Sequence, residues 1–388
     1  MSGSPRATYN SWLCFAALCI LGITGAVIPR MHGDSREPSS KTGPGPTGDS
    51  QISIDEAGTV HIRNLEIPYS DLASPESKSL FIKVIREREV RNAELAGITE
   101  IKELRRRLDE TYIIPNLREN QALFPAAIQA QRIGGVQTDV VTPIGGVAER
   151  NAHRVLINLH GGGFAVAGRF GGQAEAVPLA NLERIKVVAV DYRMGPEFHF
   201  PAANEDVEKV YRELLKTYPA KNIGIYGCSA GAILTAQSVA WFRAHHLPRP
   251  GAVGMFGGGA VADHWGDSNY FGAALGGYSA PDMPPNVNTI EYLKGADLHD
   301  ALVSPAYYDD VLAWFPPSLI ISGTRDMQLS PSVFTHERLV DLGAQSDLHV
   351  WEGSIHCSIS WDDPESRQAY RVIVKFFDQH LGIAAEDR

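Results

Sequence analysis

The sequence is poor in cysteine and has no excess of basic residues. It contains four cysteines among 388 residues, and 35 lysines and arginines stand against 45 aspartates and glutamates, for a formal net charge of -10 at pH 7. This acidic balance argues against nucleic-acid binding, because phosphates need lysine and arginine for neutralisation. Hydrophobic residues make up 44% and charged residues 21%, which is typical of a globular protein and not of a disordered one.

Only one apolar run approaches the length of a membrane span. It covers residues 12–28, and Arg6 is the only charged side chain before it. This pattern predicts a secretory signal with cleavage after Ala26. The alternative is a retained anchor, because the run is at the lower limit for crossing a bilayer. We assign residues 1–28 to a signal peptide or N-terminal anchor and expect an exported protein, periplasmic or secreted. Residues 29–51, rich in glycine, proline and serine, predict a flexible linker.

The rest of the chain divides by periodicity. Residues 52–132 predict a helical cap region, in which Ser74-Pro75 is typical of a helix start and a second helix is expected from Thr99. Residues 133–388 predict a domain in which strands alternate with helices, the α/β class with a doubly wound, mostly parallel sheet. Several strands are apolar throughout, as expected when helices cover both faces of the sheet. The expected strands are 155–160, 187–192, 223–227, 253–258, 318–323 and 347–353.

A serine stands between small residues at the end of one expected strand. Residues 227–231 read Gly-Cys-Ser-Ala-Gly and are followed by a helical stretch. A tight turn needs small flanking residues, and it exposes Ser229 at a helix N-terminus, whose dipole favours developing negative charge. Ser229 is therefore a candidate nucleophile. Residues 262–300 interrupt the alternation with glycine, proline and aromatic residues, and we interpret them as a cap-like insertion over this site.

A glycine-rich loop follows the strand expected at 155–160. It reads His160-Gly161-Gly162-Gly163-Phe164. Backbone N–H groups in such a loop can approach an oxyanion closely, because glycine has no side chain in the way. A phosphate-binding loop is the alternative, but the Gly-Lys-Ser/Thr that completes that motif is missing. We interpret the loop as part of an oxyanion hole.

An acid and a histidine follow the serine in the order that hydrolases of this topology use. Asp326 comes after the strand at 318–323, and His356 comes after the strand at 347–353. The carboxyl ends of the strands are where an open α/β sheet places its site. The predicted triad is therefore Ser229, Asp326 and His356. Fallback positions for the acid are Asp310 and Glu352; the less well placed histidines are His199, His264 and the pair His245-His246.

Together these segments resemble the hormone-sensitive-lipase-like (bacterial family IV) carboxylesterases of the α/β-hydrolase fold. The resemblance rests on HGGGF (160–164), DYRMGPEFHFPAA (191–203), GCSAGA (227–232), LVSPAYYD (302–309), SGTRD (322–326) and IHCS (355–358). It implies a helical N-terminal cap on a catalytic domain, and an oxyanion hole from the backbone N–H groups of Gly162, Gly163 and Ala230. It implies a small-molecule ester as substrate and no metal or organic cofactor. The structural supports that it implies are His160, Gly161, Asp191, Arg193 and Glu197.

The few cysteines occupy unusual positions. Loss of the signal would remove Cys14 and Cys19 and leave Cys228 and Cys357, each beside a member of the predicted triad. The family usually has an acidic residue before the nucleophile and a glycine after the histidine, so both cysteines are departures. Because the serine and the histidine must come within hydrogen-bond reach, the two cysteines could form a disulfide in an oxidising compartment. Two free, buried thiols are the other arrangement.

The combined motifs predict carboxylester hydrolysis through two-step acyl transfer. The resemblance favours short- to medium-chain acyl esters, because a cap limits the length of the pocket. The same residues could open a lactone or cleave an amide. Two alternatives belong to other classes: a non-catalytic binding protein of the hydrolase fold, and an enzyme whose cysteine pair switches the site by redox state.

Overall fold

The computed structural model describes residues 52–56, 58–62, 65–262, 266–278 and 290–382. The segments expected at 1–28 and 29–51 lie outside this range, as do parts of the insertion expected at 262–300. Within the described residues, no helix combines the length and the apolar character needed to cross a bilayer.

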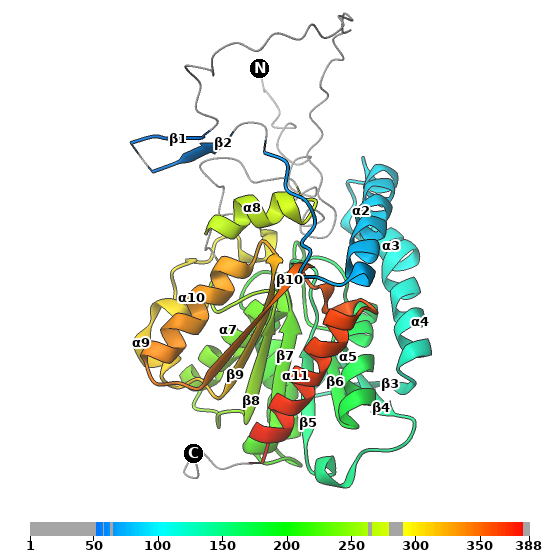
Figure 1. Ribbon diagram of the computed structural model, residues 1–388. Coiled ribbons are helices and arrows are strands. Elements are labelled where there is room, and N and C mark those ends of the chain that lie inside the picture. Colours follow the sequence, from blue (N-terminus) through cyan, green and yellow to red (C-terminus); the bar gives the residue numbers. More distant parts are fainter. Residues whose placement is uncertain (1–51, 57, 63–64, 263–265, 279–289, 383–388) are drawn as a thin grey trace, which may run out of the picture.

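An eight-stranded sheet forms the centre of the molecule (Figure 1). Its order is β10-β9-β8-β7-β5-β6-β4-β3. Neighbouring strands from β10 to β6 are parallel, whereas β4 runs antiparallel to both β3 and β6. The strands are β3 (Ala126–Ile133), β4 (Val136–Pro143), β5 (Val155–Leu159), β6 (Lys186–Val190), β7 (Ile223–Cys228), β8 (Ala252–Phe256), β9 (Ser318–Arg325) and β10 (Ser346–Ile355). The predicted α/β class and mostly parallel sheet are confirmed.

Helices cover both faces of the sheet. Helices α6 (Ala202–Leu214), α7 (Ala230–Ala244) and α10 (Leu329–Asp341) contribute to the apolar cluster on one face, and α5 (Arg169–Glu183) and α11 (Pro364–His380) to the cluster on the other (Figure 1). This coverage explains why β5, β7 and β8 are buried along their whole length. The short helices α8 (Asp267–Leu275) and α9 (Asp309–Leu312) follow β8.

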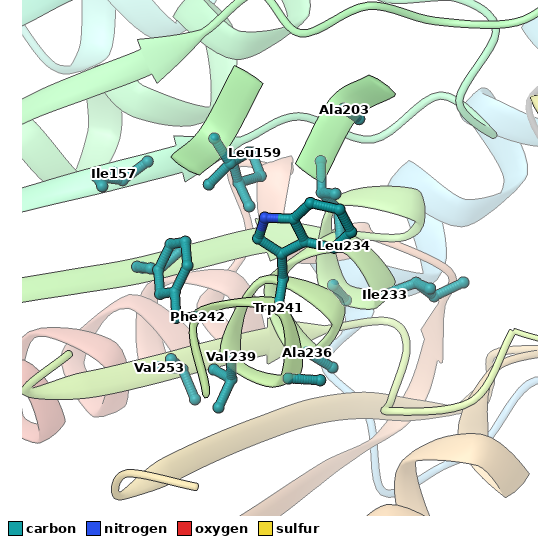
Figure 2. Close-up of a cluster of buried hydrophobic side chains, with 14 of the residues drawn as sticks. Ile157, Leu159, Ala203, Ile233, Leu234, Ala236, Val239, Trp241, Phe242 and Val253 are labelled. Atoms are coloured by element: carbon teal, nitrogen blue, oxygen red, sulfur yellow. The ribbon is translucent and has the colours of Figure 1, made fainter. Parts of the chain in front are cut away.

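The core beneath Ser229 is built around α7. Figure 2 shows Phe242 and Val239 of this helix gathered with Ile157 of β5 and Val253 of β8, all of them buried. Trp241 is also largely buried, and its indole N–H donates to Glu208 of α6 at 2.5 Å. Helix α7 is therefore held on a close-packed base.

A cap of three helices precedes the sheet in sequence. It consists of α2 (Pro75–Leu95), α3 (Ile101–Leu108) and α4 (Ile114–Leu123), the last two joined by a π-helical turn at Asp109–Ile113. As the sequence predicts, Ser74 caps α2, and its hydroxyl accepts from the N–H of Ser77 at 3.1 Å. The helix expected from Thr99 begins at Ile101.

Two features correct the predicted organisation of residues 52–132. The expected boundary at 132/133 falls inside β3, which pairs with β4 from Ala126 onward, so the sheet begins within the region expected to be helical. Polar and apolar residues alternate along β3, and its edge position accounts for its weak apolar signal. In addition, β1 (Ile52–Ile54) and β2 (Val60–Ile62) form a separate exposed hairpin (Figure 1).

Candidate active site

Ser229 lies at a sharp turn between β7 and α7. Its backbone angles are φ 59° and ψ -121°, a sparsely populated region for a residue other than glycine. Its N–H donates to the carbonyl of Phe256 at 2.8 Å, which fixes the turn to β8. A Cβ at Gly231 would lie 1.8 Å from the carbonyl oxygen of Leu159, so only glycine lets α7 start this close to β5. The small residues of the pentapeptide are therefore a steric requirement.

A chain of hydrogen bonds joins three strand ends. The Nε2 atom of His356 is 2.9 Å from Ser229 Oγ, and its Nδ1 atom is 2.8 Å from Asp326 Oδ1. Asp326 is 1% exposed, and its carboxylate also accepts from the N–H of Gln328 and from the hydroxyl of Ser322. These bonds leave the acid one orientation, toward the imidazole. The structure thus brings together the three residues of the predicted triad.

The two alternative acids, Asp310 and Glu352, are not part of this series of hydrogen bonds. Asp310 is exposed and pairs with Arg243 at 2.8 Å. Asp326 occupies the hydrogen-bonding position at the Nδ1 atom of His356. Of the histidines weighed against His356, His264 lies outside the described residues.

The glycine loop after β5 comes close to Ser229. Gly162 and Gly163 have φ angles of 108° and 60°, and a Cβ at Gly162 would lie 2.2 Å from the carbonyl oxygen of Val166. The loop conformation is therefore open only to glycine. Ala230 opens α7, where the first backbone N–H groups of a helix have no partner within it. Backbone donors from two elements thus lie beside the serine.

A partly buried acid that the sequence did not reveal supports this loop. Glu175 of α5 accepts from the N–H of Gly161 at 2.9 Å and from Asn158 Nδ2 at 3.0 Å. Burial raises the pKa of Glu175 to about 7, although these hydrogen bonds act in the opposite direction. No sequence pattern marks the residue, because an acid within a helix is usually exposed.

The residues expected to support the loops lie around the site. His160 is fully buried and stacks on Tyr192 at a centroid distance of 4.2 Å, and its Nδ1–H donates to Gly161 O at 2.7 Å. Burial lowers the pKa of His160 to about 4, so this imidazole is neutral at physiological pH. Burial likewise raises the pKa of Asp191, which accepts a backbone hydrogen bond from Arg169 at the start of α5.

The other two expected supports form ion pairs. Arg193 bonds Asp206 at 2.8 Å and Glu205 at 2.7 Å, both on α6. Glu197 receives two hydrogen bonds of 2.8 Å from Arg105 of α3. The segment after β6 is thereby tied to α6 on one side and to the cap on the other.

Cys228 and Cys357 are bonded to each other in the structure, with their Cα atoms 6.3 Å apart. This separation falls within the usual range for a disulfide. The bond joins the residue before Ser229 to the residue after His356. Of the two arrangements open from the sequence, the structure therefore has the disulfide.

A cavity of about 160 Å³ opens beside Ser229. Its floor includes Gly161, Gly162, His356 and the disulfide, and its roof comes from the cap and from Tyr278 after α8. Phe271 of α8 is 45% exposed and does not line this cavity. Within the described chain, no cluster of three or more His, Cys, Asp or Glu side chains is arranged to hold a metal ion.

Comparison with known proteins shows which fold and which enzymes this chain is similar to. A family profile described as alpha/beta hydrolase fold matches residues 156–360. An acetyl-hydrolase of Streptomyces hygroscopicus is 28% identical over 241 residues, which cover 60% of this chain and 78% of that protein. An acetyl esterase of Salmonella schwarzengrund is 25% identical over 240 residues, or 57% of this chain and 72% of that one.

Solved structures extend the likeness over a larger share of the chain. The crystal structure of an esterase E25 shares 31% identity with a TM-score of 0.70, and the match covers 83% of this chain and 98% of that one. An esterase from the bacterial hormone-sensitive lipase family shares 25% identity with a TM-score of 0.68, covering 80% of this chain and all of that one. The chain therefore belongs to the α/β-hydrolase fold family, as a carboxylesterase of the hormone-sensitive-lipase-like group.

Proposed function

We propose that Ser229 is the nucleophile of this esterase, with His356 as general base and Asp326 as the residue that orients the imidazole. The hydrogen-bonded chain from Asp326 through His356 to Ser229 carries the proposal, because both bonds are within 2.9 Å. A nucleophile and base within hydrogen-bond reach, with the base oriented by a third group, is the arrangement that activates a serine.

The proposed reaction has two acyl-transfer steps. His356 Nε2 accepts the proton of Ser229 Oγ while this oxygen attacks the ester carbonyl carbon, and the imidazolium then protonates the departing alcohol. Water enters, gives a proton to His356 and attacks the acyl-enzyme, and Ser229 recovers its proton as the carboxylic acid leaves. Asp326 keeps the Nδ1–H tautomer of the imidazole and stabilises its charged form.

We assign the oxyanion hole to the backbone N–H groups of Gly162, Gly163 and Ala230. The positive φ angles of the two glycines and the position of Ala230 at the start of α7 support this assignment. Each donor of such a hole typically contributes about 3–4 kcal/mol to transition-state stabilisation. Because these donors are backbone groups, the glycine loop itself has to be rigid, and the bond from Gly161 to Glu175 supplies part of that rigidity.

The substrates proposed are esters with short to medium acyl chains. A cavity of about 160 Å³ supports this range, since an apolar cavity of about 150 Å³ holds one benzene molecule. The acetyl-hydrolase and the acetyl esterase named above agree with it. Hydrolysis of p-nitrophenyl esters of increasing acyl length measures the range directly, and a rate that falls with length is expected.

Ser229→Ala, assayed in parallel, tests the nucleophile. The variant should lose turnover on every ester while it keeps the melting temperature of the parent protein. Turnover at the parent rate would remove Ser229 from the mechanism. A folded parent protein that hydrolyses none of these esters would instead favour lactones or amides as substrates.

We also propose that the protein is exported. The apolar run after Arg6 supports export, and so does the disulfide, because disulfides persist in oxidising compartments. Cell fractionation followed by N-terminal sequencing tests this proposal. A mature protein that begins at Val27 is expected; an intact N-terminus in the membrane fraction indicates the retained anchor, and an intact protein in the cytoplasm contradicts export.

A further inference from the structure

Two buried arginines of the cap line the cavity of Ser229. Arg88 and Arg91 both belong to α2, and their residues are 5% and 9% exposed. Arginine is almost never buried unless an acid pairs with it. The cap of an esterase needs apolar residues to exclude water, so two guanidinium groups at this place call for a physical reason.

Neither arginine has a carboxylate partner among the described residues. Arg88 Nη1 donates to the carbonyl of Gly276 at 3.0 Å and, at 3.4 Å, to that of Gly277, which ties α2 to the end of α8. Arg91 makes no hydrogen bond within the described chain, and its Nε atom is buried with no partner. Glu87 of the same helix, whose charge acts on Arg91, is exposed and pairs with Lys83.

The acid within the cavity does not neutralise them either. Both oxygens of Glu175 are engaged by Gly161 and Asn158, on the opposite wall formed by the sheet and α5. By contrast, Arg105 and Arg193, which hold the loops around the site, each have a carboxylate within 2.8 Å. The absence of a partner therefore distinguishes the cavity arginines from those that serve as loop supports.

An aromatic ring stacks on each of the two guanidinium groups and leaves the donors at its edge available, apart from Nη1 of Arg88. Arg88 Cζ lies 4.0 Å from the centroid of Tyr278, and Arg91 Cζ lies 4.2 Å from that of Tyr112. Stacking uses the face of the guanidinium, whereas its N–H donors point outward in the plane. A planar fork of free donors matches the geometry of a carboxylate.

We propose that the ester hydrolysed by this protein carries a carboxylate, and that Arg91, assisted by Arg88, binds it while Ser229 attacks the ester carbonyl. The inference rests on the proposed function of Ser229 and names the substrate class: half-esters of dicarboxylic acids, or acylated hydroxy acids. Two buried positive charges without counter-ions give a site that gains from an anionic ligand and gains nothing from a neutral one.

The position of Arg91 agrees with this role. It lines both the inner cavity and the wider outer groove, together with Tyr112 and Asn116, so it stands where the two meet. A carboxylate bound there would leave the inner cavity to the ester group. Burial lowers the pKa of Arg91, and the charge of Arg88 adds to this effect; a bound carboxylate would relieve both.

Matched ester pairs test the proposal. Monoethyl adipate and ethyl hexanoate differ only by a carboxylate in place of a methyl group on the acyl side, and 4-acetoxybutanoate and butyl acetate differ in the same way on the alcohol side. The wild-type kcat/KM should favour the anionic member of at least one pair, and that pair locates the carboxylate. Arg91→Met should lower this preference roughly ten- to hundredfold, as expected for the loss of a charged hydrogen bond.

Two further variants separate charge from structure. Arg91→Lys keeps the charge and should restore part of the preference. Arg86→Met is the matched control, because Arg86 lies on the same helix but is exposed and lines only the outer groove; it should leave the preference unchanged. No preference in either pair, or the same preference in wild type and Arg91→Met, overturns the proposal.

Calorimetric titration with adipate keeps this result independent of the proposed nucleophile. Adipate should bind wild-type protein and Ser229→Ala alike, and Arg91→Met should weaken the binding by roughly the same ten- to hundredfold. If Arg91→Met binds adipate as tightly as the wild type does, the proposed carboxylate site is contradicted. Turnover retained in Ser229→Ala would instead contradict the proposed function of Ser229. The effect of Arg91→Met on adipate binding could still be interpreted in that case.

Discussion

Two helices lie beside the same cavity, α7 below it and α2 above it, and they differ in how much of each helix is buried. Thirteen of the fifteen residues of α7 are buried, and they are mostly small or apolar. Only four of the 21 residues of α2 are buried, and two of these are Arg88 and Arg91. One helix is fixed by close packing on every side, whereas the other rests on the site by a narrow, partly polar face.

The difference assigns separate tasks to the two helices. Packing around α7 holds Ser229 in a strained conformation that an exposed turn would not keep. The cap contributes no residue to the hydrogen-bonded chain and sets only what surrounds the substrate. Substitutions in the sheet and the helices that cover it should therefore alter the rate of hydrolysis and the free energy of unfolding. Substitutions in α2 should alter the preference among substrates.

Asp326→Asn should give the largest effect and sharpen this contrast. The amide keeps the shape of the side chain but disturbs the imidazole tautomer, so kcat should fall by about 10⁴. Steady-state kinetics on p-nitrophenyl acetate measure it. The control is Asp310→Asn, on an exposed acid outside the chain of hydrogen bonds. A loss of less than tenfold in Asp326→Asn would place the orienting acid elsewhere.

Phe242→Ala should test the packing of α7. The ring is fully buried and stacks on Tyr211 at a centroid distance of 4.2 Å. Its removal should lower the free energy of unfolding by about 3–5 kcal/mol. Val90→Ala, at a residue of α2 that is 61% exposed, should change it by less than about 0.5 kcal/mol. If urea titrations give equal losses of unfolding free energy for the two variants, the two helices do not differ in packing as described.

Removal of the disulfide should give the next largest change. Cys228 and Cys357 are 129 positions apart in the sequence, and a disulfide typically contributes about 2–4 kcal/mol by constraining the unfolded chain. The variant Cys228→Ala/Cys357→Ala should lose this amount in urea titrations, and its esterase activity should fall because the loop of His356 is no longer joined to the turn of Ser229.

Reductant provides the matched control for the disulfide. It should lower the stability and activity of the wild type and leave the double variant unaffected. Thiol counting on denatured, unreduced protein should find no titratable cysteine in a mature chain that has lost Cys14 and Cys19. Two titratable thiols would show that the pair is free, and equal responses to reductant would rule out the redox dependence.

The parts of the site that could be predicted from the sequence are those that steric rules tie to a motif. Ser229, Asp326 and His356 each follow a strand, and the parallel sheet brings the carboxyl ends of these strands to one edge. Gly162 and Gly231 were identifiable for a similar reason, because no other residue fits beside the backbone that crosses there. The strands and helices of the sheet domain could be predicted from local sequence patterns of the same kind.

The parts that could not be predicted depend on tertiary contacts. Arg88 and Arg91 stand in a helix with many charged residues, and nothing in the local pattern separates a guanidinium that faces the cavity from one that faces water. Strand β3 has a weak apolar signal because it lies at the sheet edge, so the boundary of the cap was misplaced. Glu175 gave no signal, since its burial follows from the closure of α5 over β5 and β7.

Glu175→Gln should have the smallest effect, and one that depends on pH. The folded protein raises the pKa of this acid from 4.5 to about 7, so between these values the folded state binds more protons than the unfolded state. The contribution of Glu175 to the free energy of unfolding is fully present below pH 4.5 and is lost as the pH rises through 7. The loss should reach roughly 3 kcal/mol at most, since one pKa unit corresponds to about 1.4 kcal/mol.

Melting temperatures from pH 5 to pH 8 separate this effect from an ordinary change in packing. Glutamine can still accept from Gly161 and donate toward Asn158 Oδ1, which is buried without a partner. The variant should therefore match the wild type at pH 5 and exceed it at pH 8. Glu119→Gln, on an exposed acid of α4, provides the control. Parallel curves for Glu175→Gln and the wild type would show that the acid is ionised across this range, and that the glycine loop rests on a carboxylate and not on a carboxylic acid.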